Sequence, residues 1–467
     1  MQLSHTHPVK SAVFDDPNLV SSAGLVPAVK LAARAGLAVL ADRHLSVSTD
    51  KGANAGGKVT ALVAGMVAGA DSIDDMALLR HGAMGRVFDR TYAPSTLGSF
   101  LRAFTFGHVR QLDAVASRFV TALADRTPLV RANPDAPVLL DVDDTVIEVH
   151  GHAKQGAGFG YSRVRGLNAL IATVTTEESA PVVVAQRLRR GACGSPRGAA
   201  RLVADALKTV TRLAPGRPVL VRADSAFYGR PTIAAALRAG AQVSVTVRLD
   251  PNVKKAIAAI GDDAWTPIQY TNAIRDEDTG AWISAAEVAE VGYTAFSSRP
   301  TSEQVTGRLV VRRIPDANVA KKKAAGQGTL FDTWRFHAFF TTTDPTVLDT
   351  VATDQTHRGH AIIENVHADL KNSALAHLPS GKFNANAAWL VLAVIAFNLT
   401  RAAAAIVGPD LAKTTTATIR RKLIHIPARI ASSARRITLH LPTGWPWETA
   451  WIQLFSHGCG PPAASTP

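Results

Sequence analysis

The sequence predicts a mixed α/β fold with a helical N-terminal region, a mixed β-sheet core and a partly β insertion. Three observations support this prediction. Apolar residues recur at helical spacing up to about residue 133. Strand-like runs rich in Val, Ile and Leu alternate with helical segments between residues 138 and 249. Helical periodicity returns after a polar segment that ends near residue 345, so we expect the core to be split by an insertion.

Composition restricts the class of protein. A chain of 467 residues is long enough for two to four domains, and 47% hydrophobic residues with a mean hydropathy of +0.08 are typical of a globular protein. The net charge of +14 and pI near 10.1 favour a polyanionic partner such as nucleic acid, although a basic solvated surface would give the same values. Only Cys193 and Cys459 are present, which excludes a disulfide framework or a cysteine zinc site and suits a reducing cytoplasm.

The N-terminal region contains two helical patterns. Ile73, Met76, Leu78 and Leu79 lie at helical spacing, and residues 95–125 form a long amphipathic pattern that begins with a Ser/Thr cap candidate. The segment "RANPDAP" then predicts a linker.

Two segments have patterns that also occur in nucleotide-binding and membrane-spanning proteins. "GANAGGKV", residues 52–59, has the spacing of a phosphate-binding loop, but Val59 stands where that loop needs a hydroxyl and no strand precedes it. We therefore expect no nucleotide partner. The longest apolar run, residues 387–397, is short of the ~20 residues that span a bilayer, so we expect a buried helix and no membrane partner.

The stretch "VLLDVDDTVIEV", residues 138–149, places Asp141, Asp143 and Asp144 in an apolar, β-branched strand. Carboxylates there are costly unless the strand presents them to a metal, a phosphate or water. One interpretation is a phosphatase of the haloacid dehalogenase class that uses Asp141 and Asp143. The other is a metal-dependent nuclease or transposase with an Asp on the first strand of a ribonuclease H-like sheet. The phosphatase alternative gives no role to Asp224, to the helix of Glu364 or to the basic surface.

The order of elements favours the second interpretation. Strand-like runs at residues 138–149, 166–174 and 181–189 precede a helix, and two further strands follow, separated by a second helix. This β-β-β-α-β-α-β order is that of a ribonuclease H-like fold, in which the first and fourth strands lie side by side. Asp143 and Asp224 would then meet across the sheet.

A third carboxylate comes from "THRGHAIIENVHADLK", residues 356–371. At 100° per residue, five polar side chains fall within an arc of roughly 80° on one helix face: His357, His360, Glu364, His367 and Lys371. A solvated charged face would show the same pattern. Ligation by Glu364 and His367 in a di-iron bundle would need a second Glu-x-x-His, which the sequence lacks.

These segments together resemble the DDE transposases of bacterial insertion sequences, in the group with a Tyr, Arg, Glu, Lys signature on the last catalytic helix. His357, His360, Glu364 and Lys371 stand at the signature places, with His in the Tyr and Arg positions and Arg358 beside them. "RADSAFYGR", residues 222–230, is similar to the segment around the second Asp. "LDVDDTVIEVHG", residues 140–151, resembles the segment around the first, which gives Asp143 and Thr145.

The resemblance implies an activity and a set of partners. Asp143, Asp224 and Glu364 would be catalytic and would hold two Mg²⁺ ions, with Mn²⁺ as a substitute. Asp141 and Asp143 point to the same face of the strand, so either could be the first ligand. We choose Asp143 for its relation to Thr145 and rank Asp141 second. His357, Arg358, His360 and Lys371 would contact DNA. The partners would be inverted-repeat DNA at the transposon ends and target DNA, bound by a homodimer in the synaptic complex, in a bacterial cytoplasm and associated with the nucleoid.

Four regions are expected. Residues 1–133 would form a helical DNA-binding region, and residues 134–249 with 346–407 a split catalytic domain. Residues 250–345 would form a mixed, partly β insertion. Residues 408–467 would form a basic region, since seven Lys and Arg but no acidic residue lie between Asp410 and Glu448.

Overall fold

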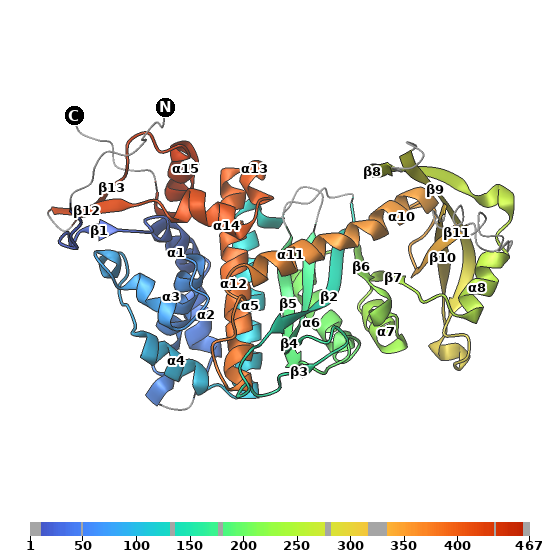
Figure 1. Ribbon diagram of the computed structural model, residues 1–467, viewed down its shortest axis with the longest axis horizontal. Helices are drawn as coiled ribbons and strands as arrows, with labels where there is room; N and C mark the ends of the chain where they lie inside the picture. The colour runs from blue at the N-terminus through green and yellow to red at the C-terminus, as the bar shows by residue number, and fades with distance from the viewer. Residues whose placement is uncertain are drawn as a thin grey trace.

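The computed structural model describes residues 11–47, 50–130, 136–175, 181–275, 282–315, 334–433 and 436–460. It has a mixed α/β architecture (Figure 1). A group of helices from the N-terminal region lies at one end, a large mixed sheet occupies the middle, and the strands of the insertion lie at the other end.

The N-terminal region is helical, but its helices begin and end at other residues than the sequence predicts. The helices are α1 (Leu25–Arg34), α2 (Leu37–His44), α3 (Ala55–Val67), α4 (Pro94–Arg102) and α5 (Phe106–Ala124). The helix predicted around Ile73 is wrong, because this segment forms short 3₁₀ turns, Asp74–Leu79 and Met84–Arg86. The long pattern of residues 95–125 is two helices, and Thr105 begins the second with a reciprocal capping box to His108.

The central strands have the order that the sequence predicts. They are β2 (Val138–Glu148), β3 (Gly158–Phe159), β4 (Arg165–Thr175), β5 (Val182–Arg190), β6 (Val219–Ala223) and β7 (Gln242–Thr246). The strand β4 pairs antiparallel with both β2 and β5, whereas β6 pairs parallel with both β2 and β7. The first and fourth main strands, β2 and β6, are therefore hydrogen-bonded neighbours. The helices α6 (Ala199–Leu213) and α7 (Arg230–Arg238) supply the crossovers.

The insertion extends the central sheet. Its described elements are α8 (Pro251–Ala258), β8 (Thr266–Arg275), β9 (Trp282–Ala295), β10 (Val305–Pro315) and β11 (Trp334–Thr341). Because β11 pairs antiparallel with β7, the ten strands β2–β11 of the described residues form one continuous sheet. The strands of the insertion are thus linked to the core by backbone hydrogen bonds.

The polar helix predicted for residues 356–371 is interrupted. It is divided into α10 (Thr350–Arg358), a 3₁₀ turn (Gly359–Ala361) and α11 (Ile362–Lys371), which together cross from the insertion to β2 (Figure 1). The break has a physical cause at Arg222, whose guanidinium donates to the carbonyl of Thr356. A Cβ on Gly359 would lie 2.8 Å from Arg222 Nη1, so glycine permits this close approach.

The apolar run of residues 387–397 lies in a buried helix, which confirms that prediction. It is part of α12 (Phe383–Val407), which packs against α3, α5 and β5. Among the described helices, α12 alone is long and apolar enough to cross a membrane, but 94% of its most apolar window is buried inside the protein. The side chain of Asn398 pairs with the backbone N–H and C=O of Val183, which satisfies polar groups on the edge strand β5.

The C-terminal region joins the N-terminal region. It contains α13 (Pro409–Ala412), α14 (Thr416–Ile419), β12 (Ala428–Ser433), β13 (Arg436–His440) and α15 (Glu448–Cys459). A short N-terminal strand, β1 (Leu19–Val20), pairs with β12, and β12 pairs with β13. This second sheet brings opposite ends of the described chain side by side (Figure 1).

Candidate active site on strand β2 and helix α11

The three aspartates of β2 have three different environments. Asp141 is completely buried and forms a two-point ion pair with Arg222 of β6, at 2.8 Å from Nε and 2.7 Å from Nη2. His360 Nδ1 lies 2.9 Å from the same carboxylate. Both oxygens of Asp141 are therefore held by protein groups, which suits a structural ion pair rather than a metal ligand.

Asp144 lies on the opposite face of β2, as the alternation of a strand requires. Its carboxylate accepts hydrogen bonds from Asn168 of β4 and Arg189 of β5. The Arg189 guanidinium also donates to the carbonyls of Ser195 and Arg197, at 2.8 and 2.7 Å. Asp144 is therefore part of a network that holds the turn after β5 against β2.

Asp143 is the member of the trio whose carboxylate is neither fully buried nor held by a cation. Its side chain is 22% exposed, and one oxygen accepts the backbone N–H of Asp144 at 2.7 Å. Because Val142 is paired with Ala223 in parallel register, the next residues, Asp143 and Asp224, lie at the same level of the sheet. Burial raises the pKa of Asp143 to about 6, and the nearby charge of Asp224 adds to this shift.

Asp224 follows the last residue of β6 and begins a 3₁₀ turn, where its carboxylate accepts the N–H of Ala226 at 2.9 Å. Although its side chain reaches the surface, the surrounding protein removes part of its hydration and raises its pKa. The structure thus places Asp143 and Asp224 at the same level of the sheet, and the charge of Asp224 disfavours the ionised form of Asp143. A divalent cation neutralises such a pair with the oxygen ligands that it prefers.

The helix α11 is anchored to the protein at both ends. At its start, His360 contacts Asp141. At its end, the buried Asp369 pairs with Arg401 of α12 at 2.8 Å and accepts the N–H of Thr416. Lys371 Nζ donates to Thr145 Oγ1 of β2 at 3.0 Å. These contacts hold the backbone of Glu364 beside β2.

Glu364 itself points to solvent. Its side chain is exposed, and the described residues supply it with no hydrogen bond or ion pair. Within the same residues, no three His, Cys, Asp or Glu side chains are gathered closely enough to hold a metal ion. The structure therefore brings two of the three predicted carboxylates together, and it places the third on a fixed helix with an unrestrained side chain.

Three of the predicted DNA-contacting residues are engaged with the protein, namely His360, described above, His357 and Arg358. His357 lies 2.8 Å from Ser244 Oγ and 3.0 Å from Thr246 Oγ1 through its two ring nitrogens, and it stacks on Phe339. Desolvation lowers the pKa of His357 to about 3, so its ring is neutral. Arg358 pairs with the buried Asp354 at 2.8 Å.

Two residues of this site, Arg222 and His367, were not among the site residues predicted from the sequence. Arg222 joins β6, β2 and α10, but a single arginine in an apolar strand gives no signal of its partners. His367 is buried, with Nδ1 3.7 Å from Asp143 Oδ2 and no hydrogen-bond partner for Nε2. Burial and then the charge of Lys371 lower the pKa of His367 to about 4. The sequence places His367 on the same helix face as Glu364, and this shared face was the pattern from which His367 could have been predicted as a site residue.

The phosphatase alternative does not fit this arrangement. It needs an accessible carboxylate nucleophile, whereas Asp141 is 0% exposed and fully paired. The acidic pair that this alternative would use, Asp262 and Asp263, lies in an exposed 3₁₀ turn after α8 and not at the end of a strand.

The raised pKa of Asp143 predicts a pH-dependent stability in the metal-free protein. The pKa of Asp143 is higher in the folded protein than in the unfolded chain, where it is near 4. The contribution of this carboxyl group to stability is therefore fully present below pH 4 and is lost as the pH rises through 6. Asp143→Asn removes this loss, so the variant should be more stable than the wild type above pH 6, by about 2–3 kcal/mol. Urea unfolding with a chelator from pH 4 to 8 measures the difference, and parallel pH profiles would contradict it.

Comparisons with known proteins identify the family of this chain. No curated protein matches the chain at a significant level. A solved structure, the cryo-EM structure of piggyBac transposase synaptic complex with hairpin DNA, aligns with a TM-score of 0.37 and 10% identity, over 88% of this chain and 79% of that one. A family model described as transposase DDE domain group 1 matches residues 3–457. Since this match spans nearly the whole chain, the protein belongs to the DDE transposase family.

Proposed function

We propose that this transposase cleaves the ends of a bacterial insertion sequence and joins the freed 3′-hydroxyls to target DNA. The observation that carries the proposal is the position of Asp143 and Asp224, each directly after the last paired residue of the parallel strands β2 and β6, beside the anchored helix of Glu364. The proposed partners are inverted-repeat DNA and target DNA, bound by a homodimer in the cytoplasm and in association with the nucleoid. The net charge of +14 supports a polyanionic partner.

A ribonuclease H-like core is part of this proposal. The spatial order β5-β4-β2-β6-β7, with an antiparallel meander followed by two parallel strands, supports it. We assign residues 1–133 and the basic C-terminal region to binding of the DNA ends. Their packing around α12 and through the β1–β12–β13 sheet supports one joint unit.

The carboxylates present fit a divalent metal, which this family generally uses. Burial raises the pKa values of Asp143 and Asp224, and both residues supply oxygen ligands. We propose Mg²⁺, with Mn²⁺ as a substitute, held by these two residues and Glu364. When bound, two such ions lower the pKa of the attacking water and stabilise the leaving 3′-oxygen.

The protein groups around the metal ligands have separate tasks. Glu364 would join Asp143 and Asp224 by a rotation of its side chain, which no described contact opposes. The Asp141–Arg222 ion pair with His360 fixes the start of α11 and so positions Glu364. Lys371 would contact a DNA phosphate near Thr145. Since His357 is neutral and bonded to the sheet, we assign it a structural role and do not propose a DNA contact for it.

A cleavage assay tests the function. The substrate is a plasmid that carries the gene between its own flanking terminal sequences, incubated with the purified protein in Mg²⁺ or in a chelator. We expect Mg²⁺-dependent strand breaks at the ends in the wild type and none with Asp143→Asn. Turnover of a small phosphoester without DNA cleavage would contradict the proposal and restore the phosphatase alternative.

Lys371→Gln should weaken DNA binding by a similar factor for every DNA sequence, because a phosphate contact carries no base information. The slope of log affinity against log salt concentration should fall by about 1. Lys208→Gln, at an exposed lysine of α6, is the matched control and should leave the slope unchanged. Fluorescence anisotropy with labelled duplex DNA between 50 and about 200 mM salt measures both variants. Equal slopes for wild type and Lys371→Gln would remove Lys371 from the DNA interface.

A further inference from the structure

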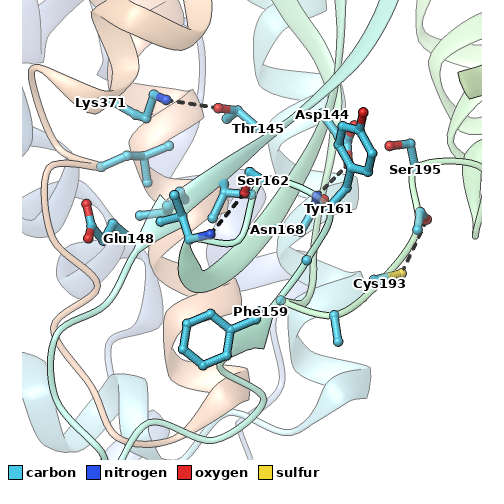
Figure 2. A pocket seen from close by; sticks show the side chains of 18 of the residues that line it. Asp144, Thr145, Glu148, Phe159, Tyr161, Ser162, Asn168, Cys193, Ser195 and Lys371 are labelled. Atoms are coloured by element: carbon cyan, nitrogen blue, oxygen red, sulfur yellow. Dashed lines mark hydrogen bonds between the residues drawn. The ribbon is translucent and has the colours of Figure 1, made fainter.

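The segment that contains α11 lies along β2 in a fixed register. Three contacts between side chains join it to every second residue of the strand: His360 to Asp141 at 2.9 Å, His367 to Asp143 at 3.7 Å and Lys371 to Thr145 at 3.0 Å. Figure 2 shows the last of them. Glu364 is four residues after His360 and three before His367, so it belongs to the same helix face between the first two contacts.

His367 is buried, and one of its two ring nitrogens is not satisfied. Its side chain lies in a residue that is 5% exposed, and Nε2 has no hydrogen-bond partner among the described residues. An unpaired polar atom in the interior costs stability, and an apolar side chain of similar volume would avoid that cost. A histidine at this position therefore points to a task for the other nitrogen, Nδ1, which faces Asp143 Oδ2.

Asp143 differs from the neighbouring aspartates of β2 in the group that faces it. Arg222 holds Asp141 through two contacts, and a guanidinium also holds Asp144. A metal ion would have to displace such a cation. A neutral imidazole donates one N–H and adds no positive charge, so it can fix the direction of a carboxylate that still attracts a cation. The backbone N–H of Asp144 already holds Oδ1 of Asp143, which leaves Oδ2 for His367.

We propose that His367 is a positioning residue of the active site, whose Nδ1–H holds Oδ2 of Asp143 so that this carboxylate meets the metal beside Glu364. The two atoms are 3.7 Å apart in the metal-free structure. Hydrogen bonds of catalytic groups are often long in ligand-free proteins and shorten when the site is complete. This inference rests on the proposed function, since it takes Asp143 as a metal ligand.

Three substitutions separate the polar role of His367 from its packing role. His367→Asn keeps a donor near the position of Nδ1, His367→Gln keeps one near Nε2, and His367→Leu keeps the volume without a donor. We expect His367→Asn to bind Mn²⁺ within about twofold of the wild type, and the other two variants to bind it about tenfold more weakly, as is usual when a group that orients a metal ligand is lost.

The measurement is electron paramagnetic resonance of free Mn²⁺, titrated with the purified full-length protein without DNA. His440→Leu, at an exposed histidine of β13, is the control for the loss of an imidazole and should bind Mn²⁺ like the wild type. In a cleavage assay with end DNA, the Mg²⁺ concentration for half-maximal rate should change in the same order as the affinity for Mn²⁺.

Stability should follow a different order, which distinguishes positioning from packing. His367→Leu should be at least as stable to urea as the wild type, because it removes the unpaired Nε2. His367→Asn should be less stable, because its smaller side chain leaves a void. If His367 only fills space, Mn²⁺ affinity should follow stability across the variants, with His367→Leu binding more tightly than His367→Asn.

The outcomes separate this inference from the proposed function. If the wild type binds Mn²⁺ no more tightly than Asp143→Asn, the proposed metal site fails and the inference fails with it. If Asp143→Asn weakens Mn²⁺ binding and His367→Leu does not, the metal site stands and the role of His367 is overturned. Rescue by His367→Gln in place of His367→Asn would also overturn it, because the donor would then be Nε2.

Discussion

Glu364→Gln should reduce cleavage of transposon-end DNA by several orders of magnitude while DNA binding persists. The change keeps the length of the side chain and removes the negative charge that a divalent cation needs. Glu364 is exposed and has no partner among the described residues, so folding should be unaffected. Binding should be equal or slightly tighter, because one negative charge near the phosphates is gone.

The measurement pairs cleavage of labelled end DNA in Mg²⁺ with a gel-shift assay of the same DNA. Asp262→Asn is the control, since it also removes one exposed carboxylate charge, in the turn after α8 and outside the regions assigned to DNA binding. It should cleave at the wild-type rate. Near-wild-type cleavage by Glu364→Gln would show that Glu364 is an exposed surface residue without a catalytic role. A different carboxylate would then have to complete the site with Asp143 and Asp224.

Asp141→Asn should destabilise the fold by about 3–5 kcal/mol, even though the residue lies two positions from Asp143. The change removes the partner of Arg222, whose side chain is 2% exposed, and leaves its buried charge uncompensated. It also loosens the contact of His360, so α11 should dock less firmly. Chemical unfolding followed by circular dichroism measures the loss, and poor soluble expression is its extreme form.

Asp143→Asn provides the comparison, because it should lose cleavage and keep or gain stability. The double variant Asp141→Leu with Arg222→Met should recover much of the stability lost by Asp141→Asn, since an apolar pair avoids the buried charge. A stable but inactive Asp141→Asn protein, together with an active Asp143→Asn protein, would exchange the roles of the two aspartates.

The pattern of the sequence predicted the core of the fold well. The three strand-like runs and the later β-α-β units correspond to β2, β4, β5, β6 and β7, and β2 lies beside β6. The buried apolar helix around residues 387–397 was also predicted. Hydrophobic patterns with a period of 2 or 3.6 residues are properties of the local sequence. They therefore predict strands and helices without knowledge of the segments that pack against them. The roles of Asp143, Asp224 and Glu364 stay predictions until the variants are measured.

Contacts between distant segments were not predictable in the same way. Alternation placed Asp141 and Asp143 on one face of a strand, but it carried no information on what covers that face. Arg222 lies 81 positions from Asp141 in the chain and His360 lies 219 positions away. Likewise, no local signal showed that β11 would pair with β7, that β1 would pair with β12 or that Arg222 would interrupt the helix at Gly359.

The sequence by itself determined the order of the core strands and the position of three aspartates on the first of them, β2. It also determined that the chain resembles the transposases. Only the tertiary structure decided which aspartate is buried with Arg222, which holds Arg189, and which remains beside Asp224. The physical reason is that a carboxylate's state depends on the charges and the water within a few ångströms. In a chain of this length, those neighbours come from segments that meet only after folding.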